Sequence, residues 1–316
     1  MSEIRKHYFL EKYCIIARAR AKRPTDFVKE REPKPKPKPE TCSFCPGNED
    51  LTPAATAVYK YESNKLTIQK DEDNKQVKNW EVRCFPNRYP ALPGHEIIAE
   101  TPDHEKHPSD FTDDEITRLM QVYSDRTTHH LKNTGTEYVS LFRNHGRDAG
   151  ASLSHPHTQL MPMPLVPPLI MQELTAIKEA DRCPYCDIVE QESGGERAII
   201  ENDHWIVFAP HCSRSPFEMW MLPKKHISSI TAPGCLTSLG TTLRDTLLKL
   251  KTLLNNPPYN YMFFQMDNSS YHLNIRIEPK LSIAAGFEKN TDVYINTMPP
   301  EDAARSLREI NAPLKI

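Results

Sequence analysis

The sequence predicts an α+β protein made of two similar halves, and three observations lead to this prediction. Segments rich in β-branched and aromatic residues accompany one long amphipathic helical pattern in each half. A Cys-x-x-Cys pair precedes the same order of segments twice along the chain. A proline-rich stretch from Pro162 to Pro168 separates the two series. We therefore expect one half at residues 1–165 and the other at residues 166–316.

Length and charge narrow the class of protein. A chain of 316 residues can bury the core of one large or two ordinary domains. Its formal net charge of -2 gives no broad electrostatic footprint for nucleic acid or an anionic membrane. No apolar run reaches membrane-spanning length, and residues 1–6 lack the apolar core of a secretory signal. We expect a soluble, cytoplasmic protein with neither nucleic acid nor a membrane as partner.

The elements of the first half follow from local patterns. Residues 8–18 have the β-branched and aromatic content of a strand or hairpin. Further strands are predicted at residues 80–85, 95–100 and 138–142. A capping box from Thr112 to Glu115 starts a helix, because the apolar residues behind it keep helical spacing to about Leu131. The last strand leads to His155-Pro156-His157, in which the proline should hold the backbone rigid.

The second half repeats this order. Residues 204–208 match the strand at 80–85. The segment from Glu218 to His226 matches the one from Glu96 to His104, with eight residues from Glu to His in both. Leucines at helical spacing from Leu236 to Leu254 form the matching helix. The strand at 259–264 approaches His272 as the strand at 138–142 approaches His155. Because every element recurs, we expect a duplicated fold.

Each half offers two cysteines and two histidines. In a reducing compartment, cysteine pairs of this spacing indicate metal binding or redox chemistry before structural disulfides. Registered histidines in both halves favour metal binding, because two thiolates and two imidazoles complete a tetrahedral zinc site. Four protein ligands leave no open position, so we expect two closed structural zinc sites per chain. The predicted sets are Cys42, Cys45, His104 and His155, and Cys183, Cys186, His226 and His272.

Comparison of the halves also isolates one reactive residue. If His155 and His272 are equivalent ligands, His157 corresponds to Asn274, so the second half has lost this histidine. His157 has no metal to bind and follows a candidate phosphate-binding turn at residues 150–152. A neutral imidazole with a pKa of about 6.5 is a competent nucleophile toward phosphorus at neutral pH. A separate basic run at residues 18–23 fits either a solvated face or an anion site.

The segment His155-Pro156-His157-x-Gln159 resembles the active-site motif of the galactose-1-phosphate uridylyltransferase family, a branch of the histidine-triad superfamily. The likeness extends to the first cysteine pair and to the segments 102–104, 216–218 and 223–226. It implies a duplicated histidine-triad-like fold, with two antiparallel-sheet halves flanked by helices, and a homodimer. It also implies ping-pong nucleotidyl transfer, in which His157 attacks the α-phosphorus of a nucleotide sugar and releases a sugar 1-phosphate. A second phosphate acceptor then takes the nucleotidyl group.

The same resemblance implies roles for further residues. Gln159 stands where histidine hydrolases carry a third histidine, which fits a reaction whose leaving group is already an ionised phosphate. The phosphates would be held by Gln159, Ser152, Asn144, Arg20 and Arg23. Asn87 would lie near the ribose, and the sugar site would draw on Phe287 and Glu288 across the dimer.

Two activities of the family fit these residues. The first is uridylyl transfer from UDP-glucose to a hexose 1-phosphate such as galactose 1-phosphate. The alternative is ADP-glucose phosphorylase, in which inorganic phosphate is the acceptor. Arg88 stands where the classical uridylyltransferase carries an acidic residue, and Asn274 and Arg276 stand at two ligand positions of its iron site. The second cysteine pair with His226 and His272 resembles the phosphorylase branch.

Two hypotheses from other classes compete with nucleotidyl transfer. A histidine-triad nucleotide hydrolase would release free nucleotide, and Gln159 disfavours it. A zinc-scaffolded binding protein without turnover would keep its nucleotide affinity and its role when His157 is replaced by alanine.

Overall fold

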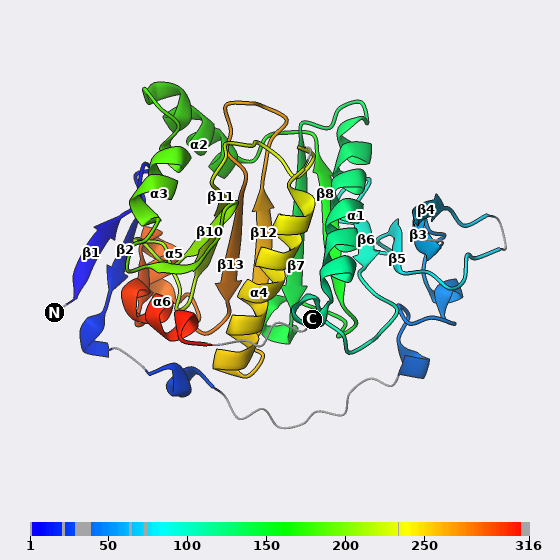
Figure 1. Cartoon of the computed structure of the whole chain (residues 1–316), viewed down its shortest axis with the longest axis horizontal. Helices are drawn as coiled ribbons and strands as arrows, with labels where there is room; N and C mark the ends of the chain where they lie inside the picture. The colour runs from blue at the N-terminus through cyan, green and yellow to red at the C-terminus, as the bar shows by residue number, and fades with distance from the viewer. Residues whose placement is uncertain are drawn as a thin grey trace.

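The structure is a computed structural model that describes residues 2–20, 23–28, 39–62, 65–72, 75–232 and 234–310. Its centre is a sheet in which eleven described strands lie side by side, each antiparallel to its neighbours (Figure 1). The order across the sheet is β4 (Lys65–Gln69), β3 (Ala57–Glu62), β5 (Val82–Pro86), β6 (Glu96–Ala99), β8 (His157–Met163), β7 (Tyr138–His145), β12 (Tyr259–Phe264), β13 (Asn274–Pro279), β11 (Met219–Pro223), β10 (Trp205–Phe208) and β9 (Ala198–Glu201).

The pair β7–β12 joins the two halves into one sheet. Its antiparallel register runs from Tyr259 opposite His145 to Phe263 opposite Leu141. From this seam outward, the first half reads β7, β8, β6, β5 and β3, and the second reads β12, β13, β11, β10 and β9. Elements that match in the sequence hold matching places in both series. The predicted α+β fold with duplicated antiparallel-sheet halves is confirmed, and the division between residues 165 and 166 stays a prediction.

The predicted match between Glu96 and Glu218 is one residue out of register. Glu96 faces helix α1 (Asp113–Leu131), where Arg126 donates to its oxygens at 2.9 and 2.8 Å. Glu218 faces the opposite side of the sheet and accepts from Trp220 Nε1 at 2.9 Å. The strand pairing shows this offset. Gln159 and Arg276 hold equivalent positions in the two halves, and they pair with Ile97 and Trp220. Glu96 therefore corresponds to the residue after Glu218.

Two long helices cover one face of the sheet (Figure 1). Helix α1 begins at the predicted capping box, where Thr112 N–H donates to Glu115 Oε2 at 2.8 Å and Glu115 N–H donates to Thr112 Oγ1 at 3.3 Å. Helix α4 (Leu236–Leu254) packs against α1 and buries the predicted leucine stripe in the main core. The helices approach closely at Gly240, where an added Cβ would lie 3.1 Å from the Ile116 carbonyl oxygen.

The N-terminal strands pack with the C-terminal part of the chain. Strands β1 (Glu3–Lys6) and β2 (Tyr13–Ile16) form a hairpin, and β14 (Tyr294–Asn296) runs parallel to β2. Residues 8–18, predicted as a strand or hairpin, contain one strand, β2. A hairpin does form, but its first strand lies before this range and residues 7–12 form the connection. The sequence analysis did not place α2 (Pro168–Glu179), α3 (Pro184–Glu192), α5 (Gly286–Thr291) or α6 (Pro300–Arg308). Among the described residues, no helix is both long and apolar enough to cross a membrane.

Candidate functional site

The first predicted metal set comes together from three segments, which are the turn at residues 42–45, the loop after β6 and the residues just before β8. Cys42 and Cys45 lie in a tight turn, in which Cys45 N–H donates to the Cys42 carbonyl at 3.1 Å. Cys45 Sγ lies 3.2 Å from His104 Nδ1 and 3.5 Å from His155 Nδ1. Bond lengths of about 2.3 Å to sulfur and about 2.0 Å to nitrogen separate the ligand atoms of a tetrahedral zinc site by roughly 3.3–3.8 Å. The set therefore fits zinc, and all four ligand atoms lie within 4.8 Å of one another.

Hydrogen bonds orient the histidine rings of this set. His155 Nε2 donates to the Thr101 carbonyl at 2.9 Å, and His104 Nε2 is hydrogen-bonded to Ser154 Oγ at 2.9 Å. The carbonyl of Thr101 can only accept, so this bond leaves Nδ1 of His155 with the lone pair that a metal needs. The hydroxyl of Ser154 can accept from Nε2 of His104, and in that arrangement Nδ1 of His104 has its lone pair as well. Burial and the neighbouring cysteine raise the pKa of Cys45 to about 12, so the thiolate needs a cation beside it.

The second predicted set has the same geometry in the other half. Cys183 precedes helix α3 and Cys186 lies in its first turn, with Cys186 N–H donating to the Cys183 carbonyl at 3.0 Å. Cys186 Sγ lies 3.4 Å from His226 Nδ1 and 3.6 Å from His272 Nδ1. His272 Nε2 donates to the Pro223 carbonyl at 3.0 Å, the counterpart of the ring–carbonyl bond in the first set. Both sets are thus assembled and could bind zinc.

His157 opens strand β8 and is buried, with 4% of its surface exposed. Its Nδ1 donates to the His155 carbonyl at 2.8 Å, which leaves Nε2 with the lone pair. Burial lowers the pKa of the ring, so the imidazole is neutral at pH 7. Asn274, the equivalent residue of the second half, makes the same bond, with Nδ2 donating to the His272 carbonyl at 3.1 Å. His157 therefore has the form of an imidazole nucleophile, whereas Asn274 keeps only the structural bond.

Side chains that the sequence analysis did not select hold His157 in place. The ring of Phe44 meets it edge-on, with 5.4 Å between centroids. Next along the strand, Thr158 Oγ1 donates to Glu100 at 2.5 Å, and Arg143 Nε donates to both oxygens of the same carboxylate at 3.0 Å. The Arg143–Glu100 pair is buried, so it fixes β8 against its neighbouring strands immediately beside His157.

Gln159 and Asn87 are brought together through His95, which the sequence analysis also did not select. Gln159 lies two residues after His157, on the same face of β8. Its Oε1 lies 2.9 Å from His95 Nε2. Asn87 N–H donates to the His95 carbonyl at 2.8 Å, and its side-chain nitrogen lies 3.4 Å from both ring nitrogens of His95. The only sequence signal for the contacts of His95 was its place at the start of a predicted strand.

Asn144 lies in the strand before the predicted phosphate turn at residues 150–152, and Ser152 is the last residue of that turn. Asn260 Nδ2 donates to Asn144 Oδ1 at 2.7 Å, which directs the amide nitrogen of Asn144 elsewhere. That nitrogen would lie 3.5 Å from a Cβ at Gly150, whose φ of +89° suits glycine. Ser152 is exposed at the end of the turn. The turn thus connects the end of β7 to His157 at the start of β8.

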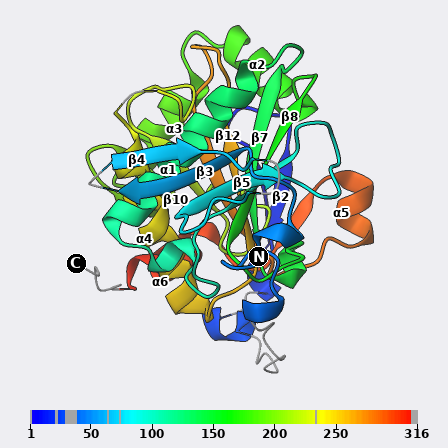
Figure 2. The ribbon, with the colours of Figure 1, turned by 90° about the vertical axis from the view of Figure 1, so that its right-hand side faces the viewer.

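Four predicted residues lie apart from this cluster. Arg20 ends a short 3-10 helix, and Arg23 is exposed. Phe287 and Glu288 lie in α5, which projects from the side of the molecule (Figure 2). Across the part of the chain that the structure describes, no hydrogen bond, ion pair or ring contact joins these four residues to His157. Glu288 instead accepts from Ala285 N–H at 2.9 Å and caps its own helix.

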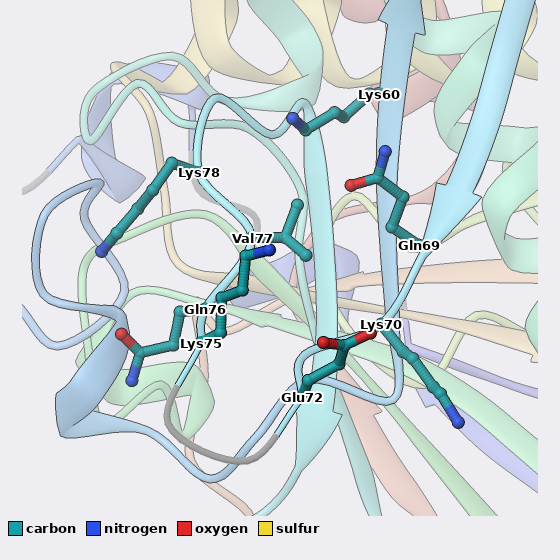
Figure 3. Close-up of a pocket in the computed structure, with 8 residues that line it drawn as sticks. All are labelled: Lys60, Gln69, Lys70, Glu72, Lys75, Gln76, Val77 and Lys78. Atoms are coloured by element: carbon teal, nitrogen blue, oxygen red, sulfur yellow. The ribbon is translucent and has the colours of Figure 1, made fainter.

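A cavity of about 430 Å³ lies beside the β3–β4 hairpin (Figure 3). It is bordered by Lys60, Lys70, Lys75 and Lys78, and Lys78 is ion-paired with Glu49. None of the residues predicted for the site lines this cavity. It is therefore separate from the histidine cluster.

Comparison with known proteins identifies the family. Residues 1–167 match the family model described as "Galactose-1-phosphate uridyl transferase, N-terminal domain". The chain belongs to the galactose-1-phosphate uridyl transferase family. The resemblance drawn from His155-Pro156-His157-x-Gln159 is thereby confirmed.

Relatives of the galactose-1-phosphate uridyl transferase family match almost the whole chain. It is 32% identical to the ADP-glucose phosphorylase of Arabidopsis thaliana, over 98% of this chain and 93% of the relative. It is 27% identical to the galactose-1-phosphate uridylyltransferase of Thermotoga maritima, over 98% of each chain. The solved Arabidopsis ADP-glucose phosphorylase with bound ADP-glucose gives a TM-score of 0.81 at 30% identity, over 99% of this chain and 100% of that one. A solved uridylyltransferase gives a TM-score of 0.71 at 26% identity, over 98% of this chain and 97% of that one. The family and its relatives support a nucleotidyl-transferring enzyme.

Proposed function

We propose that this chain is a nucleotidyltransferase that acts on a nucleotide sugar through a covalent intermediate on His157. The observation that carries the proposal is the bond from His157 Nδ1 to the His155 carbonyl, because it leaves an unprotonated Nε2. A neutral imidazole can use this lone pair without first losing a proton. His155 is in turn a ligand of the first metal set, so the backbone that orients the nucleophile is itself braced.

In the first half-reaction, the Nε2 lone pair of His157 forms a bond to the α-phosphorus. The bond from that phosphorus to the bridging oxygen breaks, and a sugar 1-phosphate leaves with the electron pair. The Nδ1 proton stays in its bond to the His155 carbonyl and helps to stabilise the positive charge on the ring. The leaving group is an ionised phosphate, so no strong general acid is required.

In the second half-reaction, an oxygen of the acceptor phosphate attacks the same phosphorus and the phosphorus–nitrogen bond breaks. His157 returns to its neutral form, and the nucleotide leaves joined to the acceptor. An ionised phosphate needs no base, whereas attack by water does. Gln159 has no basic group, which supports transfer over hydrolysis.

Neighbouring polar groups would bind the rest of the substrate. We assign Gln159, Asn144 and Ser152 to the phosphate oxygens, because amide and hydroxyl groups can donate to them, and Asn87 to the ribose. The two Cys2His2 sets would hold zinc with no position open to substrate, so zinc would supply folding energy and rigidity.

Two donor and acceptor pairs fit this mechanism, and we place ADP-glucose phosphorylase first. Similarity to the Arabidopsis ADP-glucose phosphorylase is higher in both identity and fold, at 32% and a TM-score of 0.81. The corresponding values for the uridylyltransferases above are 27% and 0.71. The sequence had favoured uridylyl transfer from UDP-glucose to a hexose 1-phosphate, which stays the second candidate because the family model carries that name.

Intact-protein mass spectrometry separates the two candidates. The protein is incubated with ADP-glucose or with UDP-glucose, without an acceptor, and the modified residue is located by peptide mapping. We expect an adduct of AMP mass on His157 from ADP-glucose. An adduct of UMP mass alone would select the uridylyltransferase. Binding or slow hydrolysis of both nucleotide sugars without any adduct on the protein would contradict covalent transfer.

We also propose a homodimer in which Arg23 and the α5 residue Phe287 serve the site of the partner copy. Among the described residues, neither side chain makes a hydrogen bond, ion pair or ring contact with His157 of its own chain, which supports this arrangement. Co-expression of His157→Asn with Arg23→Ala tests it, because a mixed dimer contains one site with both residues intact. We expect activity from the mixture that neither variant has alone. Additive residual activities, or a monomer by sedimentation, would overturn the proposal.

A further inference from the structure

His95 lies between two residues of the proposed site and has no role of its own in the mechanism above. It is buried, with 6% of its surface exposed, and it directly precedes β6, the neighbour of β8 in the sheet (Figure 1). Its Nε2 is 2.9 Å from Gln159 Oε1. Its backbone carbonyl accepts from Asn87 N–H at 2.8 Å. The residue therefore contacts both the proposed phosphate-binding amide and the proposed ribose-binding residue.

The hydrogen bonds around the ring define its tautomer. The backbone N–H of Ala91 donates to His95 Nδ1 at 3.3 Å, and a backbone N–H can only donate. Nδ1 must therefore carry a lone pair. In a neutral imidazole the proton then resides on Nε2, which faces Gln159. Burial lowers the pKa of His95, which favours this neutral form.

The tautomer in turn orients the amide of Gln159. Because Nε2–H of His95 can only donate, it selects the carbonyl oxygen of Gln159 as its partner. The NH₂ group of Gln159 is then free to donate elsewhere. A phosphate oxygen only accepts, so it needs this NH₂ group, and the opposite orientation would present a carbonyl oxygen to the phosphate. Gln159 lies on the same face of β8 as His157, two residues away, where a phosphate undergoing attack would lie.

We propose that His95 is a positioning residue that fixes the Gln159 amide for donation to the phosphate attacked by His157. The inference rests on the proposed function and adds a residue to it. His95 is not given contact with the phosphorus or the nucleophile, and it acts through Gln159 and through Asn87. The backbone N–H of Asn87 donates to the His95 carbonyl, and the side-chain nitrogen of Asn87 lies 3.4 Å from both ring nitrogens. The second half has no such arrangement, because Arg276, at the position of Gln159, donates instead to Asn274 and Glu173.

Two substitutions separate positioning from packing. His95→Phe keeps a buried ring and removes the donor, and we expect the rate of adduct formation on His157 to fall about tenfold to a hundredfold. His95→Gln places an amide nitrogen near the position of Nε2, so it should restore the rate to within about threefold of the wild type. Melting temperatures of both variants are measured alongside. Equal rates for His95→Phe and the wild type would overturn the inference.

A double-mutant cycle with Gln159→Ala completes the test. We expect His95→Phe to have no further effect on the rate once Gln159 is gone, because its target is absent. Additive losses would mean that His95 acts independently of Gln159, and the inference would be wrong. The wild-type protein serves as the control for the mechanism. If the wild-type protein forms no adduct with ADP-glucose or UDP-glucose, the proposed function is wrong. If the adduct forms equally fast in His95→Phe, only the role of His95 is wrong.

Discussion

Replacing His157 with asparagine is expected to abolish the nucleotidyl adduct and to lower turnover by at least about a thousandfold. Asparagine has no basic nitrogen to attack phosphorus. The substitution should nevertheless leave the fold intact, because Asn274 occupies the equivalent position and donates to the His272 carbonyl as His157 donates to the His155 carbonyl. The measurements are adduct mass, the steady-state rate and the melting temperature.

A matched control for this substitution is His129→Asn, because His129 is an exposed histidine of helix α1. It should leave all three measurements unchanged. An adduct that survives in His157→Asn would assign the nucleophile to another residue. A melting temperature that falls together with the rate would show that the substitution acts through stability.

Replacing Cys45 with serine is expected to remove one of two zinc ions per chain and to destabilise the protein by roughly 5 kcal/mol. Cys45 is buried and lies within 3.5 Å of both histidines of its set, so the remaining ligands cannot close a tetrahedron. For a chain of this size, the melting temperature should fall by roughly 10 °C. Zinc is counted by elemental mass spectrometry of the purified protein, and unfolding is followed by calorimetry.

Two further cysteine variants make this prediction specific. Cys235 belongs to neither set, so Cys235→Ser should keep both zinc ions and almost all of the stability. Cys186→Ser should lose the other zinc ion and lower the melting temperature, while the protein that stays folded still forms the adduct on His157. A Cys45→Ser protein with wild-type zinc content and melting temperature would contradict the assignment of the first site.

Structural features that depend on residues close together in the sequence could be predicted from it. The capping box at Thr112 and the helix end at Leu131 depend on residues within one or two turns, and the structure has them as predicted. The metal sets were predictable for a different reason. Two cysteines three residues apart leave few uses in a reducing compartment, and the repeat of the pattern selects the histidines that accompany them.

Features that depend on distant partners gave no such signal. Strand β14 pairs with β2 across most of the chain length, and nothing near residue 294 indicates that pairing. Glu100 and Arg143 look like ordinary strand residues until the fold places them in contact beneath His157. The role of His95 likewise depends on the side chain of Gln159, which is supplied by a neighbouring strand. Sequence spacing alone does not indicate which buried polar groups satisfy one another.

At the β7–β12 seam, each half covers a strand edge of the other half. This pairing keeps each edge from associating with other chains. A half released by truncation would expose β7 or β12 as a row of unpaired N–H and C=O groups, the kind of edge that recruits other chains. Because both halves have the same strand order, two copies of one half would offer each other matching edges. Tethering the halves in one polypeptide supplies that partner at a high effective concentration, whatever the amount of protein present. The tether also frees the second half from symmetry, so Asn274 can stand where the first half needs a nucleophile.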